Sequence, residues 1–329
     1  MVGWEITRRC NLSCPHCYTA AENRTRNEMT AAECRDIIDI LADWKVTAIG
    51  WTGGEPLMRG DLEDVISYAA EKGIKSGITS NGTLLDKKRA ASLKEAGASF
   101  IQISLDGSSA EKNEKMRKAT VEDYSRILGA IRACQELELR LDLAMLIGQE
   151  NLDDAAEFMN LARREGVARV RFCGFVPWGR GKHARVMERL SFNKRLHDLK
   201  NFIEKASESE NPVAMFDPAF GPLPPDYLYH TCVAGVKLFY LSAFGDVYPC
   251  TSLISKEFCI GNIRERTLPE IWDDPRMTQI AEFPRESIHG PCRDCRYFSD
   301  CRGGCRGITF AHTVDINASF PVCLYWTQN

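Results

Sequence analysis

The chain has 329 residues, of which 44% are hydrophobic and 26% charged, and its formal net charge is −3. This composition predicts a globular protein with a well-buried core, and the absence of a basic excess argues against a nucleic-acid-binding protein. No apolar run approaches the roughly 20 residues that span a bilayer, and no apolar signal stretch precedes Glu5, so we expect a cytoplasmic protein outside the membrane.

The first 210 residues alternate short apolar runs with stretches of helical periodicity, which is typical of βα units around a parallel sheet. A closed eight-unit barrel typically needs about 250 residues, so we expect an α/β fold with a partial (β/α)6 barrel. Thr30 with Glu33, and Asp61 with Asp64, match the pattern of helix N-caps. The predicted strands are residues 2–7, 46–52, 74–80, 99–106, 139–147 and 168–176, and the predicted helices are 30–43, 61–72, 86–96, 122–137, 153–165 and 191–207.

The composition changes after this alternation ends. Residues 211–230 are rich in proline, and we interpret them as a linker between a barrel at 1–210 and a small domain at 231–329. The second domain is rich in glycine, cysteine and turn residues and lacks long helical periodicity, as expected for a small fold that bound metal stabilises.

Three cysteines, Cys10, Cys14 and Cys17, directly follow the first predicted strand. A loop at this end of a parallel strand is where barrel enzymes place their active sites. Thiolates favour zinc, copper(I) or iron–sulfur clusters, and three ligands leave one coordination position open. His16 is an alternative fourth ligand, but we expect its side chain to point away from the thiols.

Seven further cysteines in the second half form a metal-binding framework, for which zinc is the common default. Seven ligands are more than one tetrahedral zinc site needs and one fewer than two such sites need. We interpret Cys34, Cys134, Cys173 and Cys259 as buried thiols outside this framework. The framework cysteines are Cys232, Cys250, Cys292, Cys295, Cys301, Cys305 and Cys323.

The spacing Cys10-x3-Cys14-x2-Cys17 resembles that of the radical S-adenosylmethionine (SAM) superfamily. The resemblance implies a [4Fe–4S] cluster whose open iron binds SAM. Three segments after successive predicted strands resemble the family's SAM contacts, and an arginine resembles the partner of the SAM carboxylate. These residues are Gly53, Gly54, Glu55 and Pro56 in TGGEP, Ser80 and Asn81 in TSNG, Ser104 and Asp106 in SLDG, and Arg117.

The back cysteines, with Gly245 five residues before Cys250, resemble the SPASM extension of this superfamily. The resemblance implies two auxiliary [4Fe–4S] clusters. Cys232, Cys250 and Cys305 would hold the first, whose fourth ligand is left open, with Cys259 the nearest spare thiol. Cys292, Cys295, Cys301 and Cys323 would hold the second. Sulfatase-maturing members place an aspartate after the second SPASM cysteine, where this chain has Thr251, so that activity is disfavoured.

The resemblance implies an enzyme that cleaves SAM reductively to a 5′-deoxyadenosyl radical, abstracts a substrate hydrogen and performs an oxidative modification. We expect a peptide or protein substrate, with tetrapyrrole side chains of a heme-type pathway as the alternative, and a flavodoxin- or ferredoxin-type electron donor. A zinc-binding interaction module is the competing interpretation. Trp178, Arg180, Lys182 and His183 lie in a loop that could bind substrate carboxylates or a planar ring.

Overall fold

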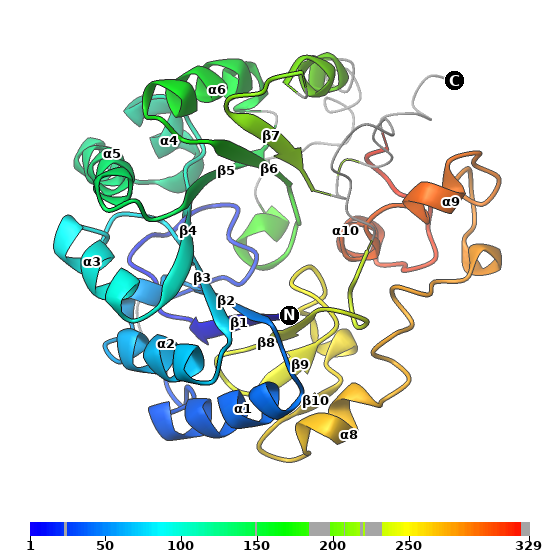
Figure 1. The fold of residues 1–329 in the computed structure, drawn as a ribbon. Coiled ribbons are helices and arrows are strands. Elements are labelled where there is room, and N and C mark those ends of the chain that lie inside the picture. The colour runs from blue at the N-terminus through cyan, green and yellow to red at the C-terminus, as the bar shows by residue number, and fades with distance from the viewer. Residues whose placement is uncertain are drawn as a thin grey trace.

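The computed structural model describes residues 1–22, 25–148, 150–183, 198–206, 208–217, 220 and 232–323. Within them, one sheet of ten strands runs in the order β10-β9-β8-β1-β2-β3-β4-β5-β6-β7. Strands β1 to β7 are parallel to one another. Helices α1 to α6 cover the outer side of this curved sheet, and the chain's C-terminal third lies beyond β1 (Figure 1). The partial-barrel prediction is confirmed.

The elements of the barrel part are β1 (Val2–Thr7), α1 (Ala31–Asp43), β2 (Ala48–Gly53), α2 (Leu62–Glu71), β3 (Lys75–Ser80), α3 (Lys87–Glu95), β4 (Ala98–Ser104), α4 (Ala110–Arg117), α5 (Val121–Glu136), β5 (Leu141–Ile147), α6 (Ala155–Arg164), β6 (Arg169–Gly174) and β7 (Val213–Phe216). The elements of the C-terminal part are β8 (Phe239–Leu241), β9 (Asp246–Tyr248), β10 (Gly261–Asn262), α8 (Leu268–Trp272), α9 (Phe298–Cys301) and α10 (Arg306–Thr313).

The predicted strands agree with β1 to β6 to within about two residues at each end. The structure also contains α4, a short polar helix that sequence periodicity misses because its buried face consists of Asn113 and Met116. Of the predicted helix at 191–207, residues 198–206 are helical and 191–197 lie outside the described part. The capping box at Thr30 is present, whereas Asp61 accepts from the Arg59 side chain and caps nothing.

The expected linker contains a seventh strand, which is a correction to the sequence analysis. Residues Val213–Phe216 pair in parallel with β6, and Phe216 stacks on Phe172 with ring centroids 5.2 Å apart. Four residues give too short an apolar run for periodicity to detect, and the partner strand is almost 40 residues away. The barrel sheet therefore continues past residue 210.

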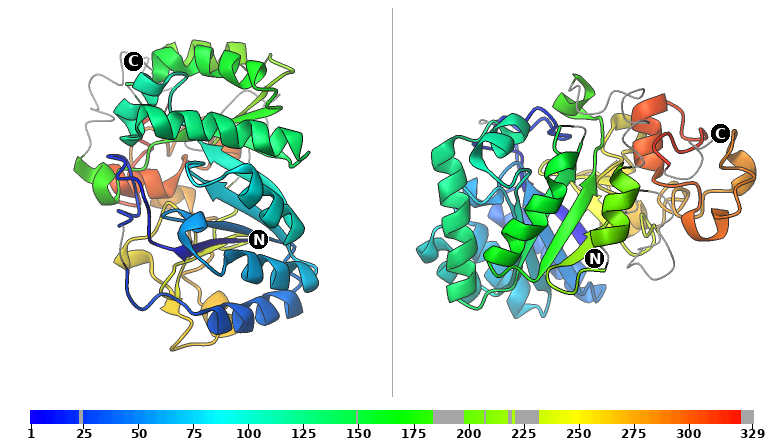
Figure 2. Two further views of the ribbon diagram at one scale, coloured as in Figure 1. Left: turned by 90° about the vertical axis from the view of Figure 1, so that its left-hand side faces the viewer. Right: turned by 90° about the horizontal axis from the view of Figure 1, so that it is seen from above.

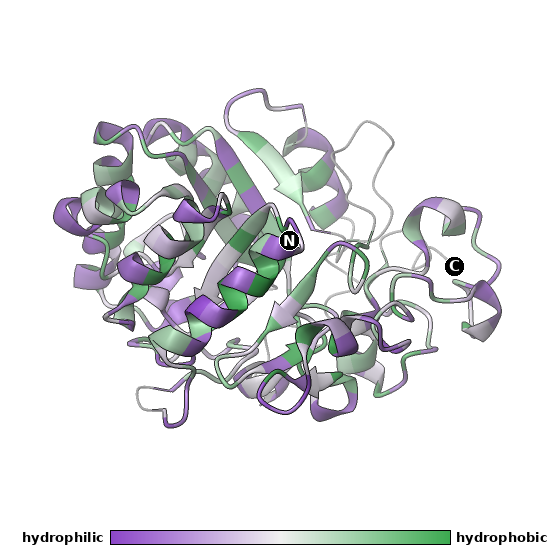
Figure 3. Ribbon diagram, turned by 60° about the horizontal axis from the view of Figure 1, so that its bottom comes forward, coloured by the Kyte–Doolittle hydropathy of each residue, from purple (hydrophilic) through white to green (hydrophobic). Residues whose placement is uncertain are grey.

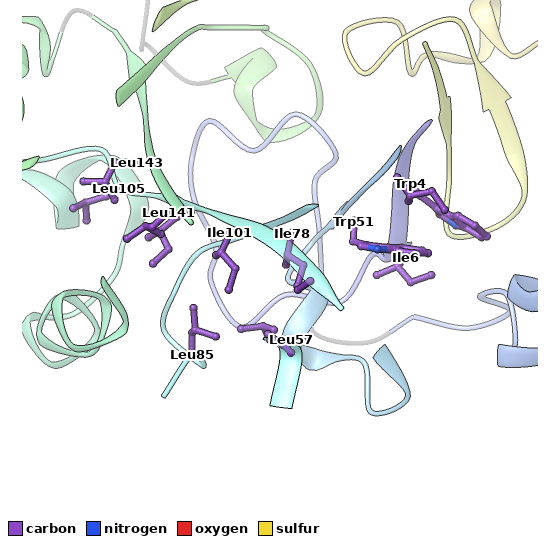
Figure 4. Packing of buried hydrophobic residues seen from close by; sticks show 14 of the residues in the cluster. Trp4, Ile6, Trp51, Leu57, Ile78, Leu85, Ile101, Leu105, Leu141 and Leu143 are labelled. Atoms are coloured by element: carbon purple, nitrogen blue, oxygen red, sulfur yellow. The ribbon is translucent and has the colours of Figure 1, made fainter. Parts of the chain in front are cut away.

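The core lies between the sheet and the helices. Odd and even positions of a strand face opposite sides of a sheet, and on β1 the buried side chains of Val2, Trp4 and Ile6 all face the helices. Trp4 and Trp51 lie next to each other with ring centroids 5.2 Å apart (Figure 4). Figure 3 shows the corresponding pattern on the helices, whose hydrophobic residues alternate with hydrophilic ones. The remaining positions of β1, which include Gly3, Glu5 and Thr7, lie on the inner face.

The C-terminal part extends this sheet at its other edge. Strand β8 pairs in parallel with β1, and β8 to β10 form an antiparallel unit. The buried Glu5 carboxylate accepts hydrogen bonds from the partly exposed Arg8 guanidinium and from the backbone N–H of Ala243, and the second of these attaches the β8–β9 turn to β1. Helices α9 and α10 lie further out, away from α1 to α6 (Figure 2). No helix of the described residues is long and apolar enough to cross a membrane.

Candidate active site and cysteine groups

The front cysteines lie on a loop that leaves the C-terminal end of β1. The Cys10 N–H donates to Glu22 O at 2.8 Å, and the Cys17 N–H donates to Cys14 O at 3.2 Å, so the loop folds back on itself. Leu12, Cys14 and Ala119 form one small apolar cluster, and Cys10 and Cys17 pack against it. Burial raises the pKa of Cys14 to about 11, so its thiol is protonated at neutral pH and must lose this proton when it binds metal.

The TGGEP segment packs directly on this loop. Gly54 N–H donates to Thr7 O at 2.8 Å, and Glu55 N–H donates to Arg9 O at 2.7 Å. A Cβ added at Gly54 would overlap Arg9 O, and one added at Gly53 would overlap Thr7 O. The glycines are therefore needed for close contact with the cysteine loop, a reason that the sequence pattern alone does not reveal.

Glu55 is fully buried, and its carboxylate joins the second and third strand ends. It accepts hydrogen bonds from Leu57 N–H at 3.1 Å, Ser80 Oγ at 2.8 Å and Asn81 N–H at 2.7 Å. Burial raises the pKa of this carboxyl, and these three donors oppose the shift. The side chains of Glu55 and Ser80 are thus hydrogen-bonded to each other. Pro56 begins the 3-10 turn that follows Glu55 and is buried beside it.

Asn81 connects the TSNG segment to the cysteine loop. Its side-chain amide donates to Asn11 Oδ1 at 2.9 Å, and the Asn11 amide donates to Thr83 Oγ1 at 2.8 Å. The same Asn81 Nδ2 lies 4.0 Å from Cys10 Sγ. The predicted residues of TGGEP and TSNG therefore meet at one place, beside Cys10.

Asp106 and Arg117 form a buried ion pair beneath the loop, with Arg117 Nε 2.7 Å from Asp106 Oδ2. Asp106 Oδ1 accepts from Leu146 N–H at 2.7 Å, so the carboxylate is occupied by protein groups. His16 Nε2 lies 3.4 Å from Asp106 Oδ2, which turns the imidazole toward this pair, and burial lowers the pKa of His16 to about 4. Ser104 ends β4 on the inner face. The sequence analysis did not foresee that His16 joins this group.

The loop after β6 also packs on the cysteine loop. Arg180 Nε donates to Cys14 O at 2.9 Å, Arg180 Nη1 donates to Ala21 O at 2.6 Å, and Arg180 N–H donates to Cys17 O at 3.0 Å. A Cβ added at Gly179 would overlap Tyr18 O. The Arg180 guanidinium therefore holds backbone carbonyls of the cysteine loop, a structural role that the sequence did not indicate, and substrate binding by this loop stays a prediction. Lys182 is exposed, and the His183 side chain lies outside the described part.

The four cysteines expected to form the second auxiliary group line one cavity. Cys292, Cys295, Cys301 and Cys323 surround it together with Phe298, Gly303 and Phe320. Three of these cysteines lie within ten residues of one another, with Cys301 at the end of α9, and Cys323 follows 22 residues later. The position of these thiols agrees with the grouping that the SPASM resemblance implies.

The remaining three cysteines approach one another at the start of α10. Cys305 occupies the N-cap position of this helix without a side-chain capping hydrogen bond. Burial raises the pKa of Cys250, and the nearby thiols of Cys305 and Cys232 raise it further. Gly307 allows the start of α10 to pack closely on Ser252, which lies two residues after Cys250, because a Cβ at position 307 would lie 2.6 Å from Ser252 O. Cys259 instead directs its thiol to Gly261 O at 3.6 Å. In the residues that the structure describes, no three His, Cys, Asp or Glu side chains are gathered as ligands of a single ion.

The sequence and its arrangement match known proteins. Residues 4–162 match the Radical SAM superfamily, and residues 232–296 match the iron–sulfur cluster-binding domain SPASM. The Fe-coproporphyrin III synthase of Methanosarcina barkeri is 30% identical, over 98% of this chain and 87% of that protein. An AdoMet-dependent heme synthase of Nitratidesulfovibrio vulgaris is 28% identical over 99% of this chain and 92% of that protein. The mycofactocin maturase MftC of Mycolicibacterium smegmatis is 29% identical over 98% of this chain and 81% of that protein.

Solved structures share the fold at lower identity. SuiB of Streptococcus suis bound to S-adenosylmethionine has a TM-score of 0.74 at 18% identity and covers 97% of this chain and 75% of that one. Native anSMEcpe with bound AdoMet has a TM-score of 0.76 at 17% identity and covers 98% and 94%. The chain belongs to the radical SAM superfamily, and it is an enzyme with a C-terminal SPASM domain.

The donor set fits the groups that this family carries. Three thiols on one loop suit a cluster that keeps one iron open. Buried polar atoms without partners, Asn113 Nδ2 and His16 Nδ1, lie among the residues around Asp106. A polar ligand bound at this place would supply the hydrogen bonds that these atoms lack.

Proposed function

We propose that this enzyme oxidatively modifies the propionate side chains of a tetrapyrrole in a heme-type pathway. Sequence analysis placed a peptide or protein substrate first and the tetrapyrrole second. The observation that reverses this order is the similarity to two relatives named for tetrapyrrole products, of which the chain covers 87% and 92%. It covers 81% of the mycofactocin maturase, at a comparable identity.

In this proposal Cys10, Cys14 and Cys17 hold a [4Fe–4S] cluster, and the segments beside Cys10 together with Arg117 hold SAM. The two groups of back cysteines each hold an auxiliary [4Fe–4S] cluster. When bound, the front cluster and SAM supply a 5′-deoxyadenosyl radical that removes a hydrogen atom from the substrate. A flavodoxin- or ferredoxin-type protein is the proposed electron donor.

The chain's own residues fix the positions of these groups. Arg180, Gly54 and Asn81 each fasten the cysteine loop from a different strand end, through hydrogen bonds between 2.6 and 3.0 Å. Asp106 holds the Arg117 side chain from the side away from solvent, and Leu146 N–H fixes Asp106 in turn. Because both members of this pair are buried, their orientation is set before any ligand binds.

The expected overall change is oxidative decarboxylation. A propionate loses one hydrogen atom to the radical, carbon dioxide and one electron, and a vinyl group remains. The electron needs an acceptor, and the auxiliary clusters proposed at the back cysteines are suited to this. Thr251 stands where sulfatase-maturing members carry an aspartate, so sulfatase maturation is not proposed.

The test is an anaerobic reaction of reconstituted enzyme with SAM, a reductant and Fe-coproporphyrin III as substrate. This choice follows the similarity to the heme synthase, because the other relative is named for Fe-coproporphyrin III as its product. We expect products that have lost carbon dioxide and two hydrogen atoms per modified side chain, with 5′-deoxyadenosine formed in proportion. Cleavage of SAM that leaves the tetrapyrrole unchanged would contradict the substrate assignment.

A peptide substrate is the second candidate, and the similarity to the mycofactocin maturase favours it. The same reaction mixture with a peptide that ends in a free carboxylate separates the two candidates. Mass change of the peptide, with the tetrapyrrole unaltered, would select this alternative.

A further inference from the structure

Tyr240 lies on the inner face of the sheet. Its neighbours on β8, Phe239 and Leu241, belong to the core on the helix side, so the side chain between them faces the other way. Parallel pairing places Tyr240 opposite Gly3 on β1. A Cβ added at Gly3 would lie 3.5 Å from Tyr240 Cδ2, which places the ring over the glycine.

This position lies between the front and back cysteine groups. The same Cβ at Gly3 would lie 3.6 Å from Cγ2 of Thr251, which directly follows Cys250. Tyr240 also interacts electrostatically with Tyr18, which directly follows Cys17, and Tyr18 interacts with Cys250. Tyr240 and Thr251 thus both lie over Gly3, and Tyr18 is among the groups near enough to influence the pKa of Tyr240.

The hydroxyl of Tyr240 lacks a partner. The residue is 1% exposed, and its Oη makes no hydrogen bond within the described part of the chain. The nearby Glu5 carboxylate is occupied by Arg8 and Ala243 N–H. Buried hydroxyls without a partner are rare in folded proteins because desolvation costs free energy that a hydrogen bond would offset. Burial raises the pKa of Tyr240 well above its usual value, so the group stays protonated and can donate.

We propose that Tyr240 Oη donates a hydrogen bond to a carboxylate oxygen of the substrate and positions it between the two cysteine groups. The inference rests on the proposed function, since it places a propionate of the tetrapyrrole at this hydroxyl. Tyr240 is thereby a substrate-binding residue of the inner face, contributed by the C-terminal part of the chain rather than by the barrel loops.

Tyr248 provides a matched comparison within the same hairpin. It pairs with Tyr240 across β8 and β9, and the two ring centroids lie 6.4 Å apart. The Tyr248 hydroxyl interacts with the Cys259 side chain, so it already has a protein partner. Loss of this hydroxyl therefore leaves the proposed substrate contact intact.

The experiment is an absorbance titration of reconstituted, SAM-loaded enzyme with Fe-coproporphyrin III, for wild type, Tyr240→Phe and Tyr248→Phe. We expect Tyr240→Phe to raise Kd about tenfold, which corresponds to one hydrogen bond to a charged group. Tyr248→Phe is expected to bind as wild type does. Iron content and thermal unfolding, measured in parallel, show whether each variant keeps its fold and clusters.

The outcomes separate the two proposals. If wild type binds Fe-coproporphyrin III and Tyr240→Phe binds it equally well, the inference about Tyr240 is wrong and the proposed function stands. If wild type does not bind it, the proposed function fails and the inference falls with it. Loss of iron or of folding in Tyr240→Phe alone would assign the hydroxyl a structural role and also overturn the inference.

Discussion

Arg180 shows how far a single residue can depart from its sequence interpretation. A cation in a glycine-containing loop at a barrel mouth suggests an anion-binding group, yet three of its N–H groups donate to backbone carbonyls of residues 14, 17 and 21. The acceptors lie about 160 residues away in sequence and are backbone atoms, which no side-chain motif identifies. The cysteines themselves were predictable because their spacing on one loop is a local property.

Replacing Arg180 with Ala should release the cysteine loop. Two charge-assisted hydrogen bonds are lost, each worth roughly 1.5–3 kcal/mol. The carbonyl of Ala21 loses its Arg180 donor, and that of Cys14 keeps only the Cys17 N–H. We expect reconstituted Arg180→Ala to lose most of the front-cluster iron and to keep the iron bound at the back cysteines, as measured by iron analysis and electron paramagnetic resonance.

Lys182→Ala is the control for this experiment, because Lys182 is an exposed cation of the same loop. Equal iron content in both variants and wild type would show that Arg180 does not support the front cluster.

A methyl group at Gly54 should be costly for the same loop. It would overlap Arg9 O and lie 2.6 Å from Arg8 O, and both are backbone atoms that cannot move alone. We expect Gly54→Ala to lower the free energy of unfolding by about 1–3 kcal/mol or more. Gly60→Ala, where nothing lies within 4 Å of the added Cβ, serves as the control in urea unfolding. Similar unfolding midpoints for the two variants would contradict this account of the glycine.

At the scale of elements, α1 is tied to the C-terminal part by an ion pair. Arg264 Nε lies 2.7 Å from Glu33 Oε1, and this hydrogen bond, with the Thr30 N–H, lowers the pKa of Glu33 to about 2. A lowered carboxyl pKa stabilises the fold above the unfolded-state value near 4.5, and this stability is lost as the pH falls toward 2. Both side chains are about one third exposed, so solvent screening keeps the contribution below about 1 kcal/mol.

Glu33→Gln is therefore expected to destabilise the protein slightly at pH 7, and the difference from wild type should shrink as the pH falls from about 4.5. Urea unfolding at several pH values measures this. Glu270→Gln is the control for loss of the helix cap. It removes the carboxylate of an equivalent capping box at α8, and Glu270, unlike Glu33, has no ion pair that joins the barrel part to the C-terminal part in the described residues. A difference that does not change with pH would exclude the ion pair as its cause.

The elements themselves were predictable to different degrees. Strands β1 to β6 each carry at least one buried apolar side chain and follow one another at regular intervals with helices between them, so pattern and position agree. Strand β7 has four residues and β8 three, and each depends on pairing with a distant strand. Their stability comes from partners rather than from their own sequence, which explains why residues 211–230 looked like a linker.

At the scale of the whole molecule, the barrel and the C-terminal part share one sheet. Strand β8 covers the free edge of β1, which carries Trp4 and Ile6 at 0% exposure. We expect residues 1–230 expressed alone to aggregate, because an uncovered edge strand next to apolar side chains can pair with other chains. Size-exclusion chromatography beside the full chain measures this. A soluble monomer with the full chain's barrel stability would show that β8 is dispensable.

The candidate site was also predictable only in part, because its motifs are local in the sequence and its contacts join distant segments. The cysteine loop, TGGEP, TSNG and Arg117 could be named from motifs. Their mutual contacts, the occupied carboxylates of Glu55 and Asp106, and the unpaired hydroxyl of Tyr240 depend on tertiary structure. Glu5 and Tyr240 carry no motif, since each is a single residue on the inner face of a strand whose other face is apolar.

The most direct test of this account is the iron, sulfide and zinc content of anaerobically reconstituted protein, measured together with 5′-deoxyadenosine formation. The same measurement is made on a variant in which Cys10, Cys14 and Cys17 are all replaced by Ala. We predict about twelve irons per chain with SAM cleavage in the wild type, and about eight irons without cleavage in the variant. Bound zinc with no 5′-deoxyadenosine would contradict the account.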